Sequence, residues 1–469
     1  MLISLFLLLT TFTRSVCCFN SSYNSTLHPN ISQSSVVQPE YNSKSFQYKG
    51  VALGGWLLLE PYITPSLFLA FNETDSSANI PVDEYHYCET LGETEASKRL
   101  QKHWSTFYNE SDFARIKSYG LNMVRIPIGY WAFKKLSSDP YVVGAQEYLD
   151  LAIEWANAND LMVWIDLHGV PGTQNGFDNS GYRDIGYPGW FNDTENLDLT
   201  YEVLNEIYTK YGDSSNQTYV DTILGIEVVN EPYGPNLNLS TLKEFYTLTY
   251  KDARDLQSIN NSIIFHDAFQ SIGYWNDYLN TTSFSNILID HHHYEVFTFG
   301  ALNMTIAEHI SSIKSYSSSI ESNEGDANPA LVGEWSAALT DCAPWVNGVG
   351  LGARYAGEQP YDNDFIGECD NINNFKKWTK ERKKDYRKYV EIQLDQYENY
   401  TMGWIFWCFK TETTIEWDFE KLVQLDLMPQ PLSDRKYIVN GTDTTAKKSI
   451  GHKLSIGWGA LFIAFVYSL

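Results

Sequence analysis

The sequence predicts an α/β protein, a (β/α)8 barrel that forms one catalytic domain with long loops around its active site. Two observations support this fold. Short apolar, β-branched runs alternate eight times with longer helical patterns, which is typical of a parallel barrel. Two of those runs lead to a glutamate, in Asn230-Glu231-Pro232 and Gly333-Glu334-Trp335, and catalytic groups collect at the carboxyl ends of barrel strands. An open doubly wound sheet, the rival fold, would usually carry a Gly-x-Gly-x-x-Gly loop after its first strand, and none follows here.

The eight strands are expected where the apolar runs lie, at residues 50–53, 123–126, 162–167, 224–229, 263–268, 287–291, 330–334 and 402–407. Amphipathic helices are expected between them. In one of these, Leu149, Ala152, Ile153 and Ala156 recur at the i, i+3, i+4, i+7 spacing of a single helix face, and a second series of this kind runs from Tyr386 to Tyr397.

The amino-terminal part of the chain shows two segments that precede the folded domain. Residues 1–18 combine an apolar run with small residues at a cleavage point, which indicates a secretory signal peptide. Residues 19–45 are rich in Ser and Asn and predict a flexible leader. The barrel is therefore expected over residues 46–439, a span that suits one domain with long loops.

The carboxyl-terminal segment, residues 440–469, has the organisation of a glycosylphosphatidylinositol (GPI) attachment signal. Small residues are followed by a polar spacer and by an apolar tail that ends the chain. The pattern predicts lipid attachment at Asn440 or Gly441, with removal of the tail. A spanning tail is the alternative, but the apolar stretch is shorter than the roughly 20 residues that cross a bilayer. We therefore expect a protein secreted to the cell surface and held at the plasma membrane or the cell wall, with the lipid as its only contact with the membrane.

Composition indicates which partners to expect. The chain of 469 residues has 33 Lys and Arg residues against 58 Asp and Glu, a formal net charge of −25, which argues against nucleic acid and anionic lipid as partners. Thirteen Asn-x-Ser/Thr sequons between Asn20 and Asn440 suit a secreted glycoprotein. The four cysteines beyond the signal peptide allow three disulfide pairings, and their wide spacing argues against a zinc site; they are Cys88, Cys342, Cys369 and Cys408.

The two glutamates predict the reaction. A glycosidase uses one carboxyl group to protonate the departing oxygen and a second to attack the sugar. Glu231 and Glu334 each follow a predicted strand, so they would meet at the same end of the barrel. For either glutamate alone, the alternative interpretation is a structural ion pair with an arginine. The presence of both glutamates is a more specific indication of a glycosidase than either one.

Other strand ends supply candidates that would support this pair. Arg125 lies in an apolar run and needs a carboxylate if it is buried. Its functional partner would be the nucleophile, whose pKa it would lower, and a structural salt bridge elsewhere is the alternative. His292 and Tyr294 lie two residues apart and share a face of a strand. The same alternation turns His292 away from its neighbours His291 and His293, so the triple-histidine run does not by itself make a metal site.

Aromatic residues and a further histidine lie near the predicted site. His168 follows a predicted strand, and Trp407, Phe177 and Phe297 fall at strand ends or in loops, where flat rings could stack on sugars. Core packing is the alternative for each aromatic residue. No Gly-x-Ser-x-Gly motif is present, so serine esterase chemistry has little support.

Longer segments carry a family resemblance. Residues 50–56, 60–66, 167–181, 333–342 and 429–435 are similar to the fungal exo-β-1,3-glucanases of glycoside hydrolase family 5, and the likeness runs from Gly50 to Tyr437. It implies a retaining barrel glycosidase with Glu231 as acid/base and Glu334 as nucleophile. The chain lacks the cysteine that follows the Asp-Arg motif in the secreted members, and Cys408 stands beside Trp407 instead.

The resemblance also implies roles for further residues. Those matching the family's remaining active-site pattern are Arg125, His168, Asn230, His292, Tyr294 and Trp407. Phe177 and Phe297 match a pair of phenylalanines that clamps the leaving glucose. Glu60 and Asp178 match sugar-contacting positions in a pocket that is closed at its far end, so that the enzyme acts from chain ends.

These observations together predict a monomeric glycosidase, without cofactor or metal, that acts on β-glucan. The expected activity is release of glucose from the non-reducing ends of β-1,3-glucan, with glucose transfer to a second glucan as a related outcome. Two alternatives stay open: a glucosidase directed at β-1,6-glucan, and a non-catalytic wall protein that binds glucan.

Overall fold

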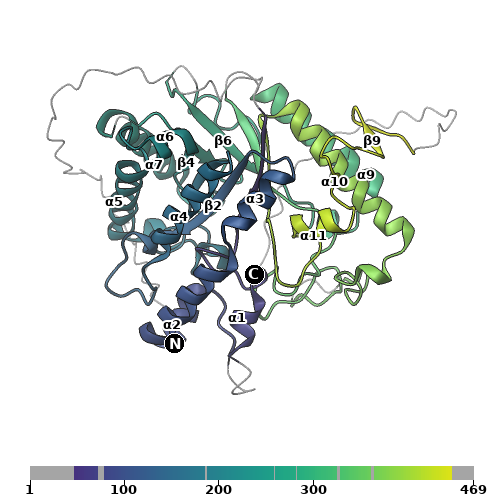
Figure 1. Cartoon of the computed structure of the whole chain (residues 1–469), viewed down its shortest axis with the longest axis horizontal. Helices are drawn as coiled ribbons and strands as arrows, with labels where there is room; N and C mark the ends of the chain where they lie inside the picture. Colours follow the sequence, from purple (N-terminus) through teal and green to yellow (C-terminus); the bar gives the residue numbers. More distant parts are fainter. Residues whose placement is uncertain are drawn as a thin grey trace, which may run out of the picture. The chain divides into compact units, whose positions relative to one another are not determined.

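The computed structural model describes residues 47–71, 79–184, 187–257, 259–280, 283–324, 328–360 and 364–445. Its centre is a closed barrel of eight parallel strands in sequence order, with β8 paired to β1. Figure 1 shows the strands at the centre of this domain and helices around them. The predicted (β/α)8 fold is confirmed. The strands are β1 (Tyr48–Ala52), β2 (Met123–Gly129), β3 (Met162–Gly169), β4 (Ile223–Glu227), β5 (Ser262–His266), β6 (Ile287–His292), β7 (Ala330–Trp335) and β8 (Gly403–Phe406).

Two strands end two residues earlier than the apolar runs suggest, and β1 and β8 end one residue earlier. β4 was expected to reach residue 229 and stops at Glu227, and β5 was expected to reach residue 268 and stops at His266. After β5, Ala268 and Phe269 both take positive φ angles of 56°, a backbone conformation that no strand can continue. Apolar character in these segments therefore reflects burial of the strand-to-loop turn, not a longer strand.

The helices in the described ranges follow the strands as the periodicity predicts. Leu149, Ala152, Ile153 and Ala156 all lie on the buried face of their helix, as expected. The helices are α1 (Pro65–Leu69), α2 (Glu84–Phe107), α3 (Glu110–Ser118), α4 (Ala145–Ala158), α5 (Thr194–Tyr211), α6 (Gln217–Thr222), α7 (Leu239–Lys251), α8 (Phe299–Leu302), α9 (Ile306–Asn323), α10 (Lys380–Tyr400) and α11 (Phe419–Gln424).

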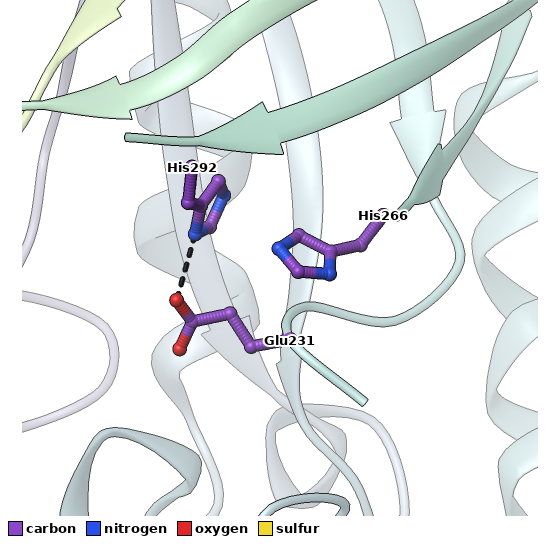
Figure 2. Close-up of side chains that lie close together, drawn as sticks. All are labelled: Glu231, His266 and His292. Carbon is purple, nitrogen blue, oxygen red and sulfur yellow. Dashed lines mark hydrogen bonds and ion pairs between the residues drawn. The ribbon is translucent and has the colours of Figure 1, made fainter. Parts of the chain in front are cut away.

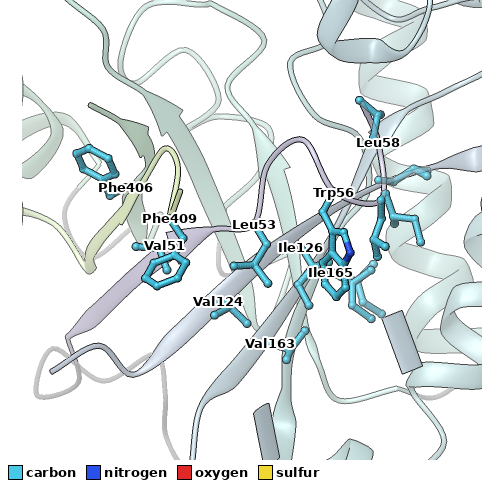
Figure 3. Packing of buried hydrophobic residues seen from close by; sticks show 14 of the residues in the cluster. Val51, Leu53, Trp56, Leu58, Val124, Ile126, Val163, Ile165, Phe406 and Phe409 are labelled. Carbon is cyan, nitrogen blue, oxygen red and sulfur yellow. The ribbon is translucent and has the colours of Figure 1, made fainter. Parts of the chain in front are cut away.

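Buried apolar residues form two clusters, one on each face of the barrel wall. Strand residues such as Val124, Ile126, Val163 and Ile165 belong to the larger cluster, which also contains helix residues, and Figure 3 shows their packing. The second cluster takes a residue from every strand and so fills the barrel interior: Tyr48, Met123, Trp164, Leu224, Ile264, Leu288, Leu331 and Ile405. This is the side-chain alternation of strands that are buried on both faces.

The interior changes from apolar to charged toward the carboxyl ends of the strands. On four strands the second residue after the apolar layer is charged or titratable, and all four of these side chains are buried. They are Arg125 after Met123, Asp166 after Trp164, His266 after Ile264 and Asp290 after Leu288. Because side chains two apart on a strand share a face, these groups form the next interior layer. The fold thereby places a charged floor at the end of the barrel where active sites lie.

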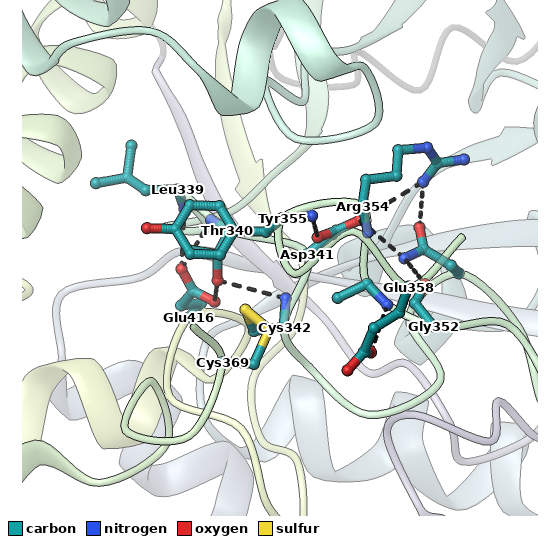
Figure 4. Close-up of a disulfide and its surroundings, with 12 residues drawn as sticks. Leu339, Thr340, Asp341, Cys342, Gly352, Arg354, Tyr355, Glu358, Cys369 and Glu416 are labelled. Carbon is teal, nitrogen blue, oxygen red and sulfur yellow. Dashed lines mark hydrogen bonds and ion pairs between the residues drawn. A yellow bond between two sulfur atoms is a disulfide. The ribbon is translucent and has the colours of Figure 1, made fainter. Parts of the chain in front are cut away.

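The long loop after β7 is closed by the disulfide Cys342–Cys369 (Figure 4). Within it, Asp341 accepts hydrogen bonds from the backbone N–H groups of Arg354 and Tyr355, at 2.8 and 3.0 Å. Cys88 and Cys408 are buried free thiols. Of the pairings that the sequence left open, the structure contains this one bridge.

The described chain continues to residue 445, beyond the expected domain end at residue 439. Strands β9 (Ile438–Val439) and β10 (Thr442–Asp443) form an antiparallel hairpin, and Asn440 and Gly441 make its turn with positive φ angles. Lys388 of α10 contacts Asp443 at 2.6 Å. The predicted attachment residues thus lie in this turn. The predicted signal peptide, the leader and the apolar tail lie outside the described residues, and none of the described helices is long and apolar enough to span a membrane.

Candidate active site

Arg125 organises the charged floor. Its Nη1 donates to Glu334 Oε1 at 2.7 Å, and its Nη2 donates to Asn230 Oδ1 at 2.7 Å. Nε and Nη2 both donate to Glu227 Oε2, at 3.0 and 2.8 Å, and Nη2 lies 3.1 Å from Asp166. The predicted partnership of Arg125 with Glu334 is therefore confirmed. Sequence reasoning missed Glu227 and Asp166, which share the same guanidinium.

The two glutamates at the predicted catalytic positions meet at one histidine. His292 Nδ1 lies 2.7 Å from Glu231 Oε1 and 3.3 Å from Glu334 Oε2. Because both oxygens lie on the same nitrogen, their separation cannot exceed the sum of those distances, 6.0 Å. The remaining oxygen of Glu231 accepts from Asn179 at 2.8 Å, and Tyr294 donates to Glu334 Oε2 at 2.8 Å.

Charge around this pair shifts the pKa values of its members. Burial alone would raise the pKa of Glu231, but the hydrogen bond and positive charge of His292 lower it to about 2. Burial opposes a charged His292, yet the surrounding carboxylates Glu334, Asp290 and Glu231 raise its pKa well above the usual range. Burial also raises the pKa of Glu334, which His292 and Arg125 partly offset. Glu231 and His292 therefore form an ion pair, and the proton of that pair resides on the imidazole.

The ends of β3 and β4 are tied together behind the glutamates. Gln174 Nε2 donates to the carbonyl oxygens of His168 and Asn230, at 2.8 and 2.9 Å. Glu231 has a positive φ of 45°, and Pro232 follows it. His168 Nδ1 lies 2.6 Å from Asp166 Oδ2. These bonds fix the turn that presents the Glu231 side chain.

Trp407 and its neighbours line another side of the floor. The indole of Trp407 stacks on the His168 ring, with centroids 5.4 Å apart and planes 8° from parallel. Its Nε1 donates to the hydroxyl of Tyr62. The next peptide bond, to Cys408, is cis. The structure thus places Trp407 beside the charged floor, where the sequence predicts it, and adds a contact with His168 that the sequence did not predict.

The predicted aromatic clamp residues lie above the floor. Phe297 is 41% exposed, with its ring 5.6 Å from Tyr294. Phe177 packs edge-on against Tyr233 at 5.5 Å, and Phe269, 40% exposed, packs on the same tyrosine at 5.5 Å. Sequence reasoning did not select Phe269, because a phenylalanine after an apolar strand resembles core.

Glu60 and Asp178 add two carboxyl groups to the site. Burial raises the pKa of Glu60 well above its usual range, and the charges of Asp178, Glu334 and Glu231 raise it further. Burial likewise raises the pKa of Asp178 to about 7, opposed by Arg183. Glu60 thus lies close enough to Asp178, Glu231 and Glu334 for their charges to raise its pKa.

A repeated sequence pattern could have identified two further site carboxylates, Asp166 and Asp290. Asp166-Leu167-His168 and Asp290-His291-His292 repeat one pattern, an aspartate two residues before a histidine at a strand end. On a strand such residues share a face. In the structure each aspartate contacts its histidine, at 2.6 and 3.3 Å.

Two groups of histidine and carboxylate side chains in the site lie close enough together to be compared with a metal site. Ligand atoms of Glu231, His266 and His292 lie within 4.8 Å of one another (Figure 2), as do those of Glu227, Asp290 and His292. The backbone N–H of Ala268 donates to His266 Nδ1 at 3.0 Å, so the other ring nitrogen carries the hydrogen and offers no lone pair. In the second group the Arg125 guanidinium already lies 2.8 Å from Glu227 Oε2, and its positive charge disfavours a second cation beside it. Neither group of residues fits a metal ion well.

The triple-histidine run behaves as strand alternation predicts. His291 binds Asp267 and Glu324 at 2.7 and 2.8 Å. His293 lies 2.7 Å from the hydroxyl of Tyr397. Of the three histidines, His292 is the one that contacts Glu231 and Glu334.

Comparison with known proteins agrees with this geometry. The family model for cellulase (glycosyl hydrolase family 5) matches residues 88–348. The chain is 52% identical to glucan 1,3-beta-glucosidase 2 of Candida albicans, with 99% of each chain covered. The chain belongs to glycosyl hydrolase family 5.

Other proteins are similar to this chain over most of their length. A sporulation-specific glucan 1,3-beta-glucosidase of Saccharomyces cerevisiae is 51% identical, covering 83% of this chain and 86% of its own. Among solved structures, rutinosidase from Aspergillus niger superposes with a TM-score of 0.62 at 19% identity, covering 82% of this chain and 98% of its own. That second likeness shows the shared barrel fold.

Proposed function

We propose that this family 5 enzyme is a retaining exo-β-1,3-glucosidase that releases glucose from the non-reducing ends of β-1,3-glucan. The observation that carries the proposal is the placement of Glu231 and Glu334 on one nitrogen of His292, with Glu231 Oε1 and Glu334 Oε2 at most 6.0 Å apart. Retaining enzymes hold their carboxyl groups about 5–5.5 Å apart, and inverting enzymes about 6.5–9.5 Å. Similarity to proteins named glucan 1,3-beta-glucosidase supports the substrate.

In the first step the Glu334 carboxylate attacks the anomeric carbon, and the bond to the leaving oxygen breaks. Arg125 and Tyr294 hold one Glu334 oxygen each, which orients the carboxylate and favours its charged form. The leaving oxygen takes a proton from Glu231. That proton comes from the Glu231–His292 pair, along their 2.7 Å hydrogen bond.

In the second step water attacks the glycosyl ester, and Glu231 takes the proton of that water. Glu231 suits the role of base because the ion pair with His292 lowers its pKa and keeps its carboxylate ionised. The product leaves with the β configuration that the substrate had. A sugar hydroxyl in place of water would give transfer of glucose to a second glucan.

Exo action would follow from the carboxyl groups at the inner end of the site. Glu60 is 4% exposed, and its Oε1 is buried without a hydrogen-bond partner among the described residues. A buried polar group of this kind needs a partner, which the hydroxyl groups of a terminal glucose would supply. Phe177 and Phe297 would hold the leaving sugar through their ring faces.

We also propose that the enzyme acts as a monomer at the cell surface, secreted and then held by a GPI lipid at Asn440 or Gly441. The sequence pattern of residues 440–469 supports this. Phosphatidylinositol-specific phospholipase C should then release the protein from membranes. Membrane partitioning that does not change with the phospholipase would count against the anchor.

Proton NMR of early products, on a panel of β-glucans, tests the proposed activity. Laminarin should give β-glucose as the first monosaccharide, before mutarotation, and a β-1,6-glucan should react more slowly. Faster hydrolysis of the β-1,6 polymer would assign that linkage as the substrate. Binding of glucan without turnover would identify a non-catalytic wall protein instead.

A further inference from the structure

Glu227 is a buried acid that the mechanism above does not use. It is the last residue of β4 and has no exposed surface. Its layer of the barrel holds five carboxyl groups within reach of a single arginine and two histidines: Glu227, Asp166, Asp290, Glu231 and Glu334. Buried anions in such excess over cations are costly unless some of them are neutral.

The two oxygens of Glu227 are used very differently. Oε2 accepts from Arg125 Nε and Nη2, at 3.0 and 2.8 Å. Oε1 is buried and has no hydrogen-bond partner among the described residues. A carboxylate in this position would leave a fully charged acceptor without a donor, which costs more than an unpaired neutral group.

Asp290 on β6 has a matching unpaired oxygen. Its Oδ2 lies 3.3 Å from His292 Nε2, while Oδ1 is buried without a partner in the described part of the chain. Glu227, Asp290 and His292 each place one polar atom within 4.8 Å of the others. A Cβ on Gly333 would lie 2.0 Å from Asp290 Oδ1, so the glycine at this position of β7 is what gives Asp290 its room.

Glu227 and Asp290 thus each hold a buried oxygen without a donor, and one oxygen of each carboxyl group lies within 4.8 Å of the other. A single proton shared between the two groups would leave one of them neutral and give the other a donor. We propose that Glu227 is held as a carboxylic acid whose Oε1–H donates to Asp290, and that it acts as a positioning residue for the catalytic pair. The resulting chain runs from Arg125 through Glu227 and Asp290 to His292. It keeps one N–H of His292 on Asp290 and directs the other at Glu231.

The groups that face Glu227 from the surrounding elements favour the neutral acid. Burial raises the pKa of Glu227 well above its usual range, and only Arg125 on β2 and, more weakly, His292 on β6 oppose this. Asp166 on β3 and Asp290 on β6 raise it further. Tyr246 of α7 also lies near Glu227: burial raises the pKa of this tyrosine, and Glu227 raises it further.

Replacement by glutamine and by leucine separates a neutral acid from an anion. In Glu227→Gln the amide oxygen accepts from Arg125 and the NH2 group donates to Asp290, as the acid would. We expect kcat/KM on laminarin to fall by less than about threefold, because this amide is the uncharged isostere of the acid. Glu227→Leu removes both contacts and should lower kcat/KM by about 10- to 100-fold.

The acid limb of the pH–kcat/KM profile provides a readout that a merely structural role would not move. If Glu227 is neutral, Glu227→Gln leaves the limb where it is in the parent enzyme. If Glu227 is an anion, its removal takes a negative charge away from Glu334, the pKa of Glu334 falls, and the limb moves to lower pH. Such a shift would overturn the proposal.

A spectroscopic measurement on the intact enzyme decides the protonation state independently of variant folding. The infrared spectrum should show a protonated carboxyl band that persists from about pH 5 to pH 8, well above the ordinary glutamate pKa of about 4.3. Glu60, whose pKa is also raised, could give a similar band, so Glu60→Gln is the control. The band assigned to Glu227 must persist in Glu60→Gln and disappear in Glu227→Gln. Absence of any band that Glu227→Gln removes would overturn the proposal, whatever the activities.

Discussion

Two adjacent layers of the barrel interior differ in what holds them together. The lower layer, with Trp164, Ile264 and Leu288, is apolar and depends on shape and volume. The upper layer, two residues further along the same strands, is charged, and each of its groups depends on a named partner. Dispersion contacts are individually weak and numerous, whereas a buried charge that loses its partner is left uncompensated. The lower layer should therefore tolerate changes that the upper layer does not.

Removal of the nucleophile should produce the largest effect. Glu334→Ala should lower kcat on laminarin by at least about 10⁴-fold, a loss on the order of those seen when a catalytic nucleophile is deleted. Azide, which can enter the space left by the side chain, should restore turnover and give a product of α configuration. Glu95→Ala, on the exposed face of α2, is the matched control. Hydrolysis near the parent rate would remove Glu334 from its proposed role.

Replacement of Arg125 by lysine should remove most hydrogen bonds of the upper layer while the positive charge is kept. Arg125→Lys offers a single ammonium in place of a planar fork that serves Glu334, Glu227 and Asn230. We expect unfolding free energy to fall by about 3–5 kcal/mol, as for a broken buried ion pair. Arg99→Lys provides the control, since its pair with Glu95 is 33% and 41% exposed and should be worth less than about 1 kcal/mol. If urea denaturation gave the same loss of unfolding free energy for Arg125→Lys and Arg99→Lys, the proposed dependence of the upper layer on its buried ion pairs would be wrong.

The pH dependence of activity tests the charges of the upper layer. Glu334 must be ionised to attack, and its pKa is raised by burial. Activity should therefore fall as pH decreases, and the limb of kcat/KM should lie above the ordinary glutamate pKa of about 4.3. His292→Gln removes the cation that opposes burial, so this limb should move to higher pH. A shift to lower pH would contradict the assigned role of His292.

A conservative change in the lower layer should produce the smallest effect. Ile264→Val removes one methylene from the apolar interior and should cost about 0.5–1.5 kcal/mol in unfolding free energy. Activity at saturating laminarin should stay within about twofold of the parent, since the barrel geometry is unchanged. Loss of activity beyond the loss of folded protein would show that the two layers are coupled more tightly than their contacts indicate.

The sequence predicted the barrel, and it predicted which two glutamates meet in the site. Both predictions depend on local patterns, namely apolar runs and the short motifs at their ends. The sequence did not predict Glu227 as a site residue, because it lies inside an apolar run and Arg125, its partner, is 102 residues away in the chain. The sequence did not predict the Cys342–Cys369 disulfide, because the pairing depends on how the loop folds back and the spacing of the cysteines does not determine that. Asn179 and Gln174 belong to the loop after β3, which contacts Asn230 and Glu231 in the segment that follows β4. Contacts between two loops cannot be read from local sequence patterns.

The covalent intermediate provides the most direct test of the account. A 2-deoxy-2-fluoro-β-glucoside with a good leaving group should slow the second step and leave one fluoroglucosyl group on the enzyme. Intact-mass measurement should show a single addition, and peptide mapping should place it on Glu334. An enzyme that turns over laminarin yet carries no addition, or carries it on Glu231 or another residue, would contradict the proposed pair of roles.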